Sequence, residues 1–324
     1  MGQKAGSRKG TWVRVVEAVR TQLQPGRRMA VGLSGGADSV VLAEALHRLG
    51  ARPVLLHFNH RWRGRSAEAD ARWVKAWGEK RELKVVLGRA SRPGRTGEGE
   101  AREGRWKFFE RAVQGGKVQE LWLAHQLDDQ AETVLMQLLR GAGPEGLAGM
   151  GKISRRGTWQ VVRPLLGFSR DEIRQAAGEA GLAWREDATN EDDHGWRVRI
   201  RKKVLPFLAE IYGRDVRGAL ARTAEILSGE AEYWKQEIGR VSIHPDTRTW
   251  RKKPAAWQRR AIRVWLAERG YAGPTFSEVE GVRKLVAGGG TATWQLRQGA
   301  GVRRSKNKLF YLNKMGLIAK AFSR

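Results

Sequence analysis

Short apolar runs alternate with longer amphipathic stretches through the first 140 residues of this 324-residue chain. The apolar runs predict buried strands at residues 29–33, 53–58, 84–87 and 121–124. The stretches between them have apolar residues at helical spacing and predict helices at residues 38–49, 66–80, 98–114 and 127–140. Strands that alternate with helices are typical of a parallel sheet covered by helices on both faces. We therefore predict an α/β fold for this region.

The pattern changes after residue 140. Residues 141–160 predict a loop, and helices are expected near 169–181 and 197–211. Pro206 is expected to end or kink the second of these helices. A longer amphipathic stretch near 216–240 predicts a connecting helix.

The final stretch of the chain is predicted to contain two helices and two short strands, at residues 254–269, 276–287, 292–297 and 307–312. We expect a catalytic domain at 1–214, a linker helix at 215–240 and a smaller, basic and mainly helical domain at 241–324.

The charge is strongly positive and uneven. The chain has 61 Lys and Arg against 34 Asp and Glu, a net charge of +27. Residues 241–324 hold 18 of the basic and 4 of the acidic residues, so about a quarter of the chain carries +14 of this excess. Such a charge favours a polyanionic partner, nucleic acid first. Several of the 14 tryptophans stand beside basic residues, which suits base stacking next to phosphate contacts.

Cysteine is absent from the sequence. This excludes disulfides, zinc–thiolate sites, iron–sulfur clusters held by cysteine and thiol nucleophiles. No apolar run is long enough to span a bilayer, and no hydrophobic signal region follows the basic N-terminus. We expect a cytoplasmic protein without a membrane partner, and a homodimer stays open.

The octapeptide Gly32-Leu33-Ser34-Gly35-Gly36-Ala37-Asp38-Ser39 joins the first predicted strand to its helix. Its glycines let the backbone approach a phosphate, which the N–H groups and dipole of the helix start then face. Both serines add hydroxyl donors, and Asp38 can hold Mg²⁺. The Gly-Lys-Ser/Thr ending of an ordinary P-loop is missing. The octapeptide therefore predicts a phosphate-binding loop of another kind.

A second motif, from Leu123 to Thr133, joins a strand end to a helix. Asp129 and Glu132 are three residues apart and share a helix face near the helix start. Such a pair can hold magnesium or bind an ammonium group. The alternative is N-terminal capping, because acidic residues favour the first helical turn anyway.

The segment from His57 to Gly64 follows the second predicted strand and includes Asn59, Arg61 and Arg63. Its two histidines and two arginines are suited to contact a nucleotide phosphate or base. A metal site is disfavoured, because no third ligand is spaced suitably. The alternative for His57 is a core histidine whose hydrogen bonds are satisfied by the protein.

Two further arginine pairs share helix faces. Arg102 and Arg105 are three residues apart, and their planar forks suit pyrophosphate. Arg197 and Arg201 are four apart on a later helix. For Arg102 and Arg105, a solvated basic face is the alternative.

These motifs in this order resemble the tRNA(Ile)-lysidine synthetase family of PP-loop ATP pyrophosphatases. The resemblance covers residues 28 to about 208. It rests on the octapeptide, Asn59-His60, Ala101-Arg102-x-x-Arg105-Trp106, Asp128-Asp129-Gln130-x-Glu132-Thr133, Arg163-Pro164-Leu165, Asp187-x-x-Asn190 and the arginine-rich helix. The basic domain resembles the family's tRNA-binding domain through residues 255–263, with Arg259 and Arg260.

The resemblance implies a two-step reaction. ATP adenylates the C2 carbonyl oxygen of the wobble cytidine in an isoleucine tRNA with a CAU anticodon, and pyrophosphate leaves. The amine of free L-lysine then attacks C2 and expels AMP, giving lysidine. ATP and Mg²⁺ are the implied cofactors, and tRNA and L-lysine the implied partners.

The implied roles divide the candidate residues into groups. The catalytic residues would be Asp38, Asp129, Glu132, Arg102 and Arg105. The ATP-binding residues would be Ser34, Gly35, Gly36, Ala37, Asp38, Ser39, His57, Asn59 and His125. The tRNA-binding residues would be Arg61, Arg63, Arg197, Arg201, Arg259 and Arg260. Asp38 is the candidate magnesium ligand.

Other classes fit the sequence less well. A PP-loop tRNA thiolase generally uses cysteines, and an amidotransferase-type relative would not explain the charge of +27. An RNA-binding protein with an inactive nucleotide-binding fold would not need Asp38, whereas this chain has it. These three classes remain alternatives to test.

Overall fold

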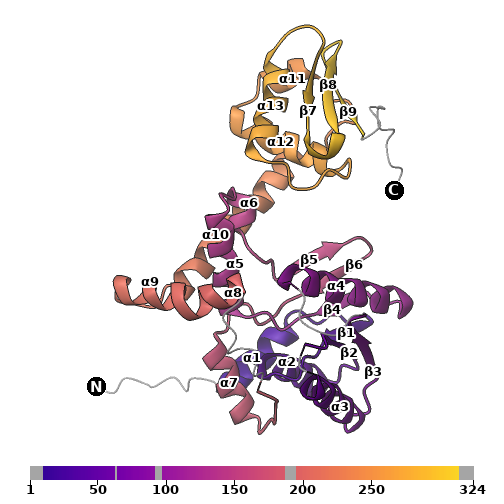
Figure 1. The fold of residues 1–324 in the computed structure, drawn as a ribbon, viewed down its shortest axis with the longest axis vertical. Coiled ribbons are helices and arrows are strands. Elements are labelled where there is room, and N and C mark those ends of the chain that lie inside the picture. Colours follow the sequence, from indigo (N-terminus) through magenta and orange to yellow (C-terminus); the bar gives the residue numbers. More distant parts are fainter. Residues whose placement is uncertain (1–9, 63, 92–96, 187–194, 314–324) are drawn as a thin grey trace. The chain divides into compact units, whose positions relative to one another are not determined.

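The computed structural model describes residues 10–62, 64–91, 97–186 and 195–313 (Figure 1). The chain divides into two compact units, Met1–Ser228 and Gly229–Arg324. The long helix α10 (Arg217–Ile238) contributes residues to both units. Within the described ranges, no helix has the length and apolar character needed to cross a membrane.

A six-stranded sheet forms the centre of the first unit, in the order β3-β2-β1-β4-β6-β5. Its strands are β1 (Met29–Gly32), β2 (Val54–Asn59), β3 (Val85–Arg89), β4 (Glu120–Trp122), β5 (Ile153–Arg156) and β6 (Trp159–Val162). Neighbouring strands pair in parallel, except that β5 is antiparallel to β6. The strand order reverses at β1, which pairs with β2 on one side and β4 on the other. Ligands of open α/β sheets bind at the carboxyl ends of the strands at such a reversal.

Helices cover both faces of this sheet, which confirms the predicted fold class. One face packs against α1 (Thr11–Arg20), α2 (Ala37–Arg48), α3 (Arg65–Glu79) and α7 (Arg170–Glu179), and the other against α4 (Glu98–Gly115). Successive strand residues alternate between the two cores: Val31 packs toward α2, whereas Ala30 packs toward Phe108 and Phe109 of α4. Burial on both faces is the reason that these strands have nearly continuous apolar runs.

The prediction of a loop at 141–160 was wrong. This stretch contains α6 (Pro144–Leu147), strand β5 and the first residues of β6. Strand β5 lies at the sheet edge and is mostly exposed, so its residues, Ile-Ser-Arg-Arg, show no apolar alternation. Gly157, with φ +57°, forms the turn between β5 and β6.

The helix predicted near 197–211 forms as three consecutive pieces: α8 (Trp196–Arg199), a π-helical turn (Ile200–Val204) and α9 (Leu205–Tyr212). Pro206 neither donates a backbone hydrogen bond nor ends the helix, and the widened turn lies directly before it. Ile200 and Leu205 are both buried against Ala131 and Leu135 of α5 (Leu127–Leu139). The helix therefore stays attached to α5 on both sides of the widened turn.

In its described residues the second unit has its own core, formed by the end of α10, three shorter helices and a three-stranded antiparallel sheet in the order β7-β8-β9. The elements are α11 (Thr247–Arg251), α12 (Ala255–Ala267), α13 (Phe276–Ala287), β7 (Ala292–Gln295), β8 (Gly301–Ser305) and β9 (Lys308–Leu312). Strand β8 was not predicted. A buried arginine, Arg304, occupies one of its inward positions, where an apolar residue would have marked the strand.

Candidate active site

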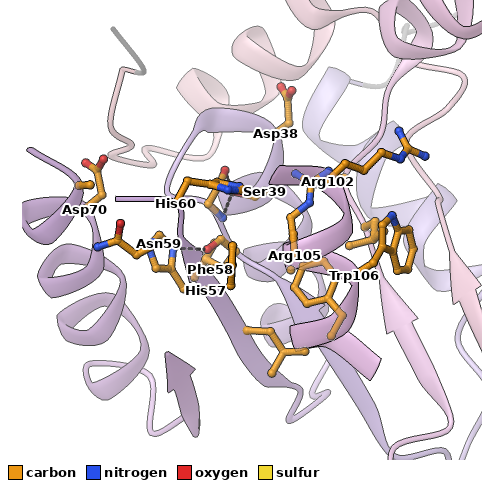
Figure 2. A pocket seen from close by; sticks show the side chains of 18 of the residues that line it. Asp38, Ser39, His57, Phe58, Asn59, His60, Asp70, Arg102, Arg105 and Trp106 are labelled. Carbon is orange, nitrogen blue, oxygen red and sulfur yellow. Dashed lines mark hydrogen bonds between the residues drawn. The ribbon is translucent and has the colours of Figure 1, made fainter. Parts of the chain in front are cut away.

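A cavity of about 380 Å³ opens at the carboxyl ends of β1, β2 and β4. Figure 2 shows Arg102, Arg105 and Trp106 on one side of it and His57 and Asn59 on the other. The predicted residues that line it are Ser34, Asp38, Ser39, His57, Asn59, Arg61, Arg102, Arg105 and His125. The fold therefore brings together motifs that are spread over 90 residues of sequence.

The glycine-rich loop between β1 and α2 is held in shape by its two serines. The Ser39 hydroxyl donates to the Gly36 carbonyl at 3.0 Å and accepts from the Ser34 backbone N–H at 3.1 Å. The Gly36 N–H donates to the Ser34 hydroxyl at 3.3 Å. Gly35 adopts φ +98°, a conformation that strongly favours glycine. The loop leads directly into the start of α2, where backbone N–H groups and the helix dipole favour an anion.

Two carboxylates from different elements face the same region. Asp38 in the first turn of α2 is half-buried, and burial together with the charge of Asp129 raises its pKa to about 6. Asp129 also caps α5, because its Oδ2 accepts from the Gln126 N–H at 3.1 Å. The capping alternative for Asp129 is thus realised, and the same side chain still acts electrostatically on Asp38.

Magnesium fits this pair of carboxylates. Mg²⁺ in nucleotide sites is bound through one or two carboxylates together with substrate phosphates, rather than by a complete cage of protein ligands. Among the residues that the structure describes, no three His, Asp or Glu side chains lie close enough to form such a cage. A cation between Asp38 and Asp129 would also offset the repulsion that raises the pKa of Asp38.

Glu132 lies one helical turn beyond Asp129 and is fully buried. Its carboxylate accepts two hydrogen bonds from Arg201, at 2.5 Å and 3.2 Å. A second arginine of the same helical segment, Arg197, donates to the Thr133 hydroxyl at 3.1 Å. Glu132 therefore holds a guanidinium at the edge of the site.

The two arginines of α4 supply positive charge to the cavity. Burial lowers the pKa of the Arg105 guanidinium, and the neighbouring charges of Arg102 and Arg197 lower it further. Three guanidinium groups that repel one another favour an anion among them. This arrangement suits a polyphosphate that the loop before α2 binds from the other side.

His57 and His125, two of the three histidines that line the cavity, are neutral and present opposite hydrogen-bonding groups. His57 Nδ1 lies 2.9 Å from the Leu33 carbonyl, which can only accept, so we assign the proton to Nδ1 and an acceptor to Nε2. His125 Nδ1 accepts from Arg163 at 3.3 Å, which leaves Nε2 as a donor. Burial holds the pKa of both below the usual range, with the charge of Arg163 adding to the effect at His125. An acceptor and a donor in one cavity suit the edge of a nucleobase.

Arg163 and Asp70 were not predicted as site residues. Arg163 is buried and bonded to His125, to the Gly151 carbonyl at 3.0 Å and to Ser154 at 2.9 Å. Asp70 lines the cavity and pairs with Arg185 at 2.5 Å. Arg163 was part of a motif in the sequence, but only the fold places it behind His125.

The remaining predicted residues lie as follows. Asn59 is buried and bonded to Glu68 and to the Arg61 backbone, so its side chain shapes the turn after β2. Arg63 and the Asp187-x-x-Asn190 motif lie outside the described residues. Arg259 pairs with Glu280 at 2.7 Å in the second unit, where Arg260 stacks on Trp234.

Fold and site together define a nucleotide-binding α/β domain with a glycine-rich phosphate loop. In agreement, a model of the PP-loop domain matches residues 12–208, and a model of the TilS substrate binding domain matches residues 246–310. The chain belongs to the tRNA(Ile)-lysidine synthase family, as predicted from its motifs.

Relatives and solved structures agree with this assignment. The tRNA(Ile)-lysidine synthase of Thermosynechococcus vestitus is 34% identical over 90% of this chain and 88% of its own length. That of Solibacter usitatus is 37% identical over 81% of this chain, which spans 62% of that protein. The U34-tRNA thiolase NcsA from Methanococcus maripaludis shares the fold, with a TM-score of 0.55 at 19% identity over 67% of this chain and 80% of its own.

Proposed function

We propose that this chain catalyses ATP-dependent formation of lysidine at the wobble cytidine of an isoleucine tRNA. The observation that supports this most is the cavity at the strand reversal. Residues of a phosphate-binding loop, the Asp38 carboxylate and the guanidinium groups of Arg102 and Arg105 line it together, and the charge of Asp129 acts on Asp38 from outside the lining. The substrate in this proposal comes from the names of the relatives. The chain spans only 62% and 55% of the Solibacter usitatus and Bacillus subtilis proteins, so their activity is proposed for this chain.

Each group has a role that follows from its charge and position. The loop before α2 and the α4 arginines bind the ATP phosphates and stabilise the charge on the departing pyrophosphate. Asp38 would hold Mg²⁺, which would neutralise phosphate charge. His57 and His125 offer the acceptor and donor for a base edge.

The carboxylates also bear on the second substrate. Lysine brings an amine that has to reach C2 of the base, and the partly exposed Asp129 carboxylate acts on Asp38 and lies 3.7 Å from Arg201. We assign recognition of this amine to Asp129. Because Glu132 is fully committed to Arg201, we give Glu132 the role of positioning Arg201 for the tRNA phosphate or the activated base.

The basic second unit would bind tRNA, largely through backbone phosphates, so affinity should fall steeply with added salt. A cytoplasmic location and a homodimer remain predictions of this proposal.

The test is AMP formation from ATP with isoleucine CAU tRNA and each amino acid in turn. We expect AMP only with this tRNA and lysine. AMP without dependence on lysine would point to another nucleophile, and tRNA binding without AMP would favour an inactive RNA-binding protein.

Asp38→Ala tests the site within the same assay. We expect AMP formation to fall by about 10²–10³-fold or more, with tRNA binding nearly unchanged. Asp171→Ala is the matched control, because Asp171 occupies the same position in the first turn of α7 and is exposed. Retained turnover in Asp38→Ala would contradict the site assignment.

A further inference from the structure

The helical segment from Trp196 to Tyr212 exposes aromatic rings to solvent. Trp196, Phe207 and Tyr212 are 65%, 58% and 61% exposed. Within the described residues, only Tyr233 and Phe276 are other aromatic side chains of comparable exposure. Apolar surface of this size is normally buried, and a gathering of it on one segment indicates a binding surface.

Trp196 and Phe207 belong to one continuous face of the helix. Trp196, Arg199, Lys203, Phe207 and Ile211 follow one another at spacings of three or four residues, so each lies about one helical turn from the next. All five are exposed, whereas Ile200 and Leu205 on the other side pack against α5. We call the exposed side the outer face of the 196–212 helix.

Positive charge accompanies the rings. Residues 196–214 contain six Lys and Arg, of which Arg197 and Arg201 bond to α5 on the other side of the helix, and Glu210 is their one acidic residue. The Arg199 guanidinium lies 5.3 Å from the Trp196 ring centre, and that of Arg214 lies 4.7 Å from the Tyr212 ring centre. A ring beside a cation offers a stacking surface for a base and a contact for its phosphate.

The same helix reaches the candidate active site with its other side. Arg201 binds Glu132 and Arg197 binds Thr133. A helix with its side chains is about 10–12 Å across, so the outer face lies roughly one helix diameter from these contacts. Nucleotides next to one held in the site could extend onto this face.

We propose that the outer face of the 196–212 helix binds the single-stranded RNA that flanks the reacting cytidine, by stacking unpaired bases on Trp196 and Phe207. This inference rests on the proposed function for the identity of the RNA. Unpaired loop bases expose their faces to aromatic side chains, whereas duplex bases are already stacked on each other. A second copy of the chain would suit the apolar rings but not a face with this excess of positive charge.

The experiment compares binding of a CAU anticodon stem-loop RNA with binding of the same stem as a plain duplex. For the double variant Trp196→Ala/Phe207→Ala we expect stem-loop affinity to fall by about 30-fold or more, since two stacked bases are lost and each contributes about 1–3 kcal/mol. Duplex and ATP affinity should be unchanged. Trp196→Phe/Phe207→Tyr should retain most stem-loop affinity, and Tyr233→Ala is the control for removal of an equally exposed ring.

Unchanged stem-loop affinity, or an equal loss for the duplex, would overturn this proposal. A change in sedimentation without an effect on RNA would assign the face to a second copy of the chain. If the wild-type protein makes no AMP but the double variant has reduced affinity for the stem-loop, the result contradicts only the proposed function. If AMP forms and the double variant keeps its KM for the stem-loop, only the outer face fails.

Discussion

The two units use arginine in different ways. In the first unit, two arginines near the site bind buried carboxylates: Arg201 binds Glu132, and Arg217 binds Asp128 at 2.5 Å. In the second unit many arginines bind backbone carbonyls instead, as Arg304 does with those of Leu285, Gly289 and Gly290. Arg251, Arg263 and Arg269 also bind carbonyls, and Arg297 binds the Gly273 carbonyl as well as the Glu278 carboxylate.

This difference changes the meaning of the net charge. The second unit is short of acidic residues, so its arginines satisfy carbonyl groups at helix ends and turns. An arginine bound in this way stabilises the unit and is less available to a phosphate. The charge of +14 in residues 241–324 therefore overstates the number of side chains that can contact RNA.

The largest expected effect concerns the buried pair of the first unit. Arg201→Ala leaves Glu132 buried and unpaired, which should lower the free energy of unfolding by about 3–5 kcal/mol at pH 7. Calorimetry or urea unfolding measures this. Adding Glu132→Gln should restore part of the loss, because no buried charge remains. Arg259→Ala, which breaks a more exposed pair in the second unit, should change stability far less. Equal losses in Arg201→Ala and Arg259→Ala would remove the contrast between the units.

A pair of neighbours tests the second unit. Arg304 is buried and bonded to three carbonyls, whereas Arg303 is exposed, and both stand on β8. Arg304→Met should lower the free energy of unfolding of this unit by about 2–3 kcal/mol. Arg303→Met removes the same charge and should leave stability unchanged.

RNA binding should show the opposite order for these neighbours. At a temperature where both variants are folded, Arg303→Met should weaken tRNA binding and reduce its salt dependence by up to about one phosphate contact. Arg304→Met should bind nearly as the wild type does. Equal effects of the two variants on binding would mean that total charge, rather than exposure, determines RNA affinity.

The smallest effect concerns Asp38. Its pKa is about 6 in the folded protein and 3.8 for the free group, so the folded state holds its proton to higher pH. The free energy of unfolding should therefore fall as pH rises from about 4 to about 6 and then level off. Asp38→Asn removes this cost and should be more stable than the wild type by about 1–2 kcal/mol at pH 7.5, with no gain at pH 4.

Asp171→Asn on α7 should show no such gain, since Asp171 is exposed. Adding Mg²⁺ should stabilise the wild type and leave Asp38→Asn unchanged if Asp38 binds the cation. A gain for Asp38→Asn that persists at pH 4 would contradict the role of its charge.

Much of the site was predictable because its motifs directly follow strands. Strands that are buried on both faces have continuous apolar sequences and can be recognised from them. Loops at the carboxyl ends of parallel strands must meet at one edge of the sheet. Asp38, His57 and His125 could therefore be named from local sequence, whereas Arg105 was named from its spacing to Arg102 on one helix face. Arg163 could not, because its role depends on a hydrogen bond to His125 from a different strand end.

The sequence by itself determined the alternating α/β order, the phosphate-binding loop and the family, because these depend on local patterns of apolar residues, glycines and charges. Only the tertiary structure decided which charges remain available. It joined Glu132 to Arg201, turned Arg304 inward and exposed the rings of Trp196 and Phe207. The physical reason is that hydrogen-bond partners and burial arise from residues far apart in the chain, and no spacing within one segment encodes them.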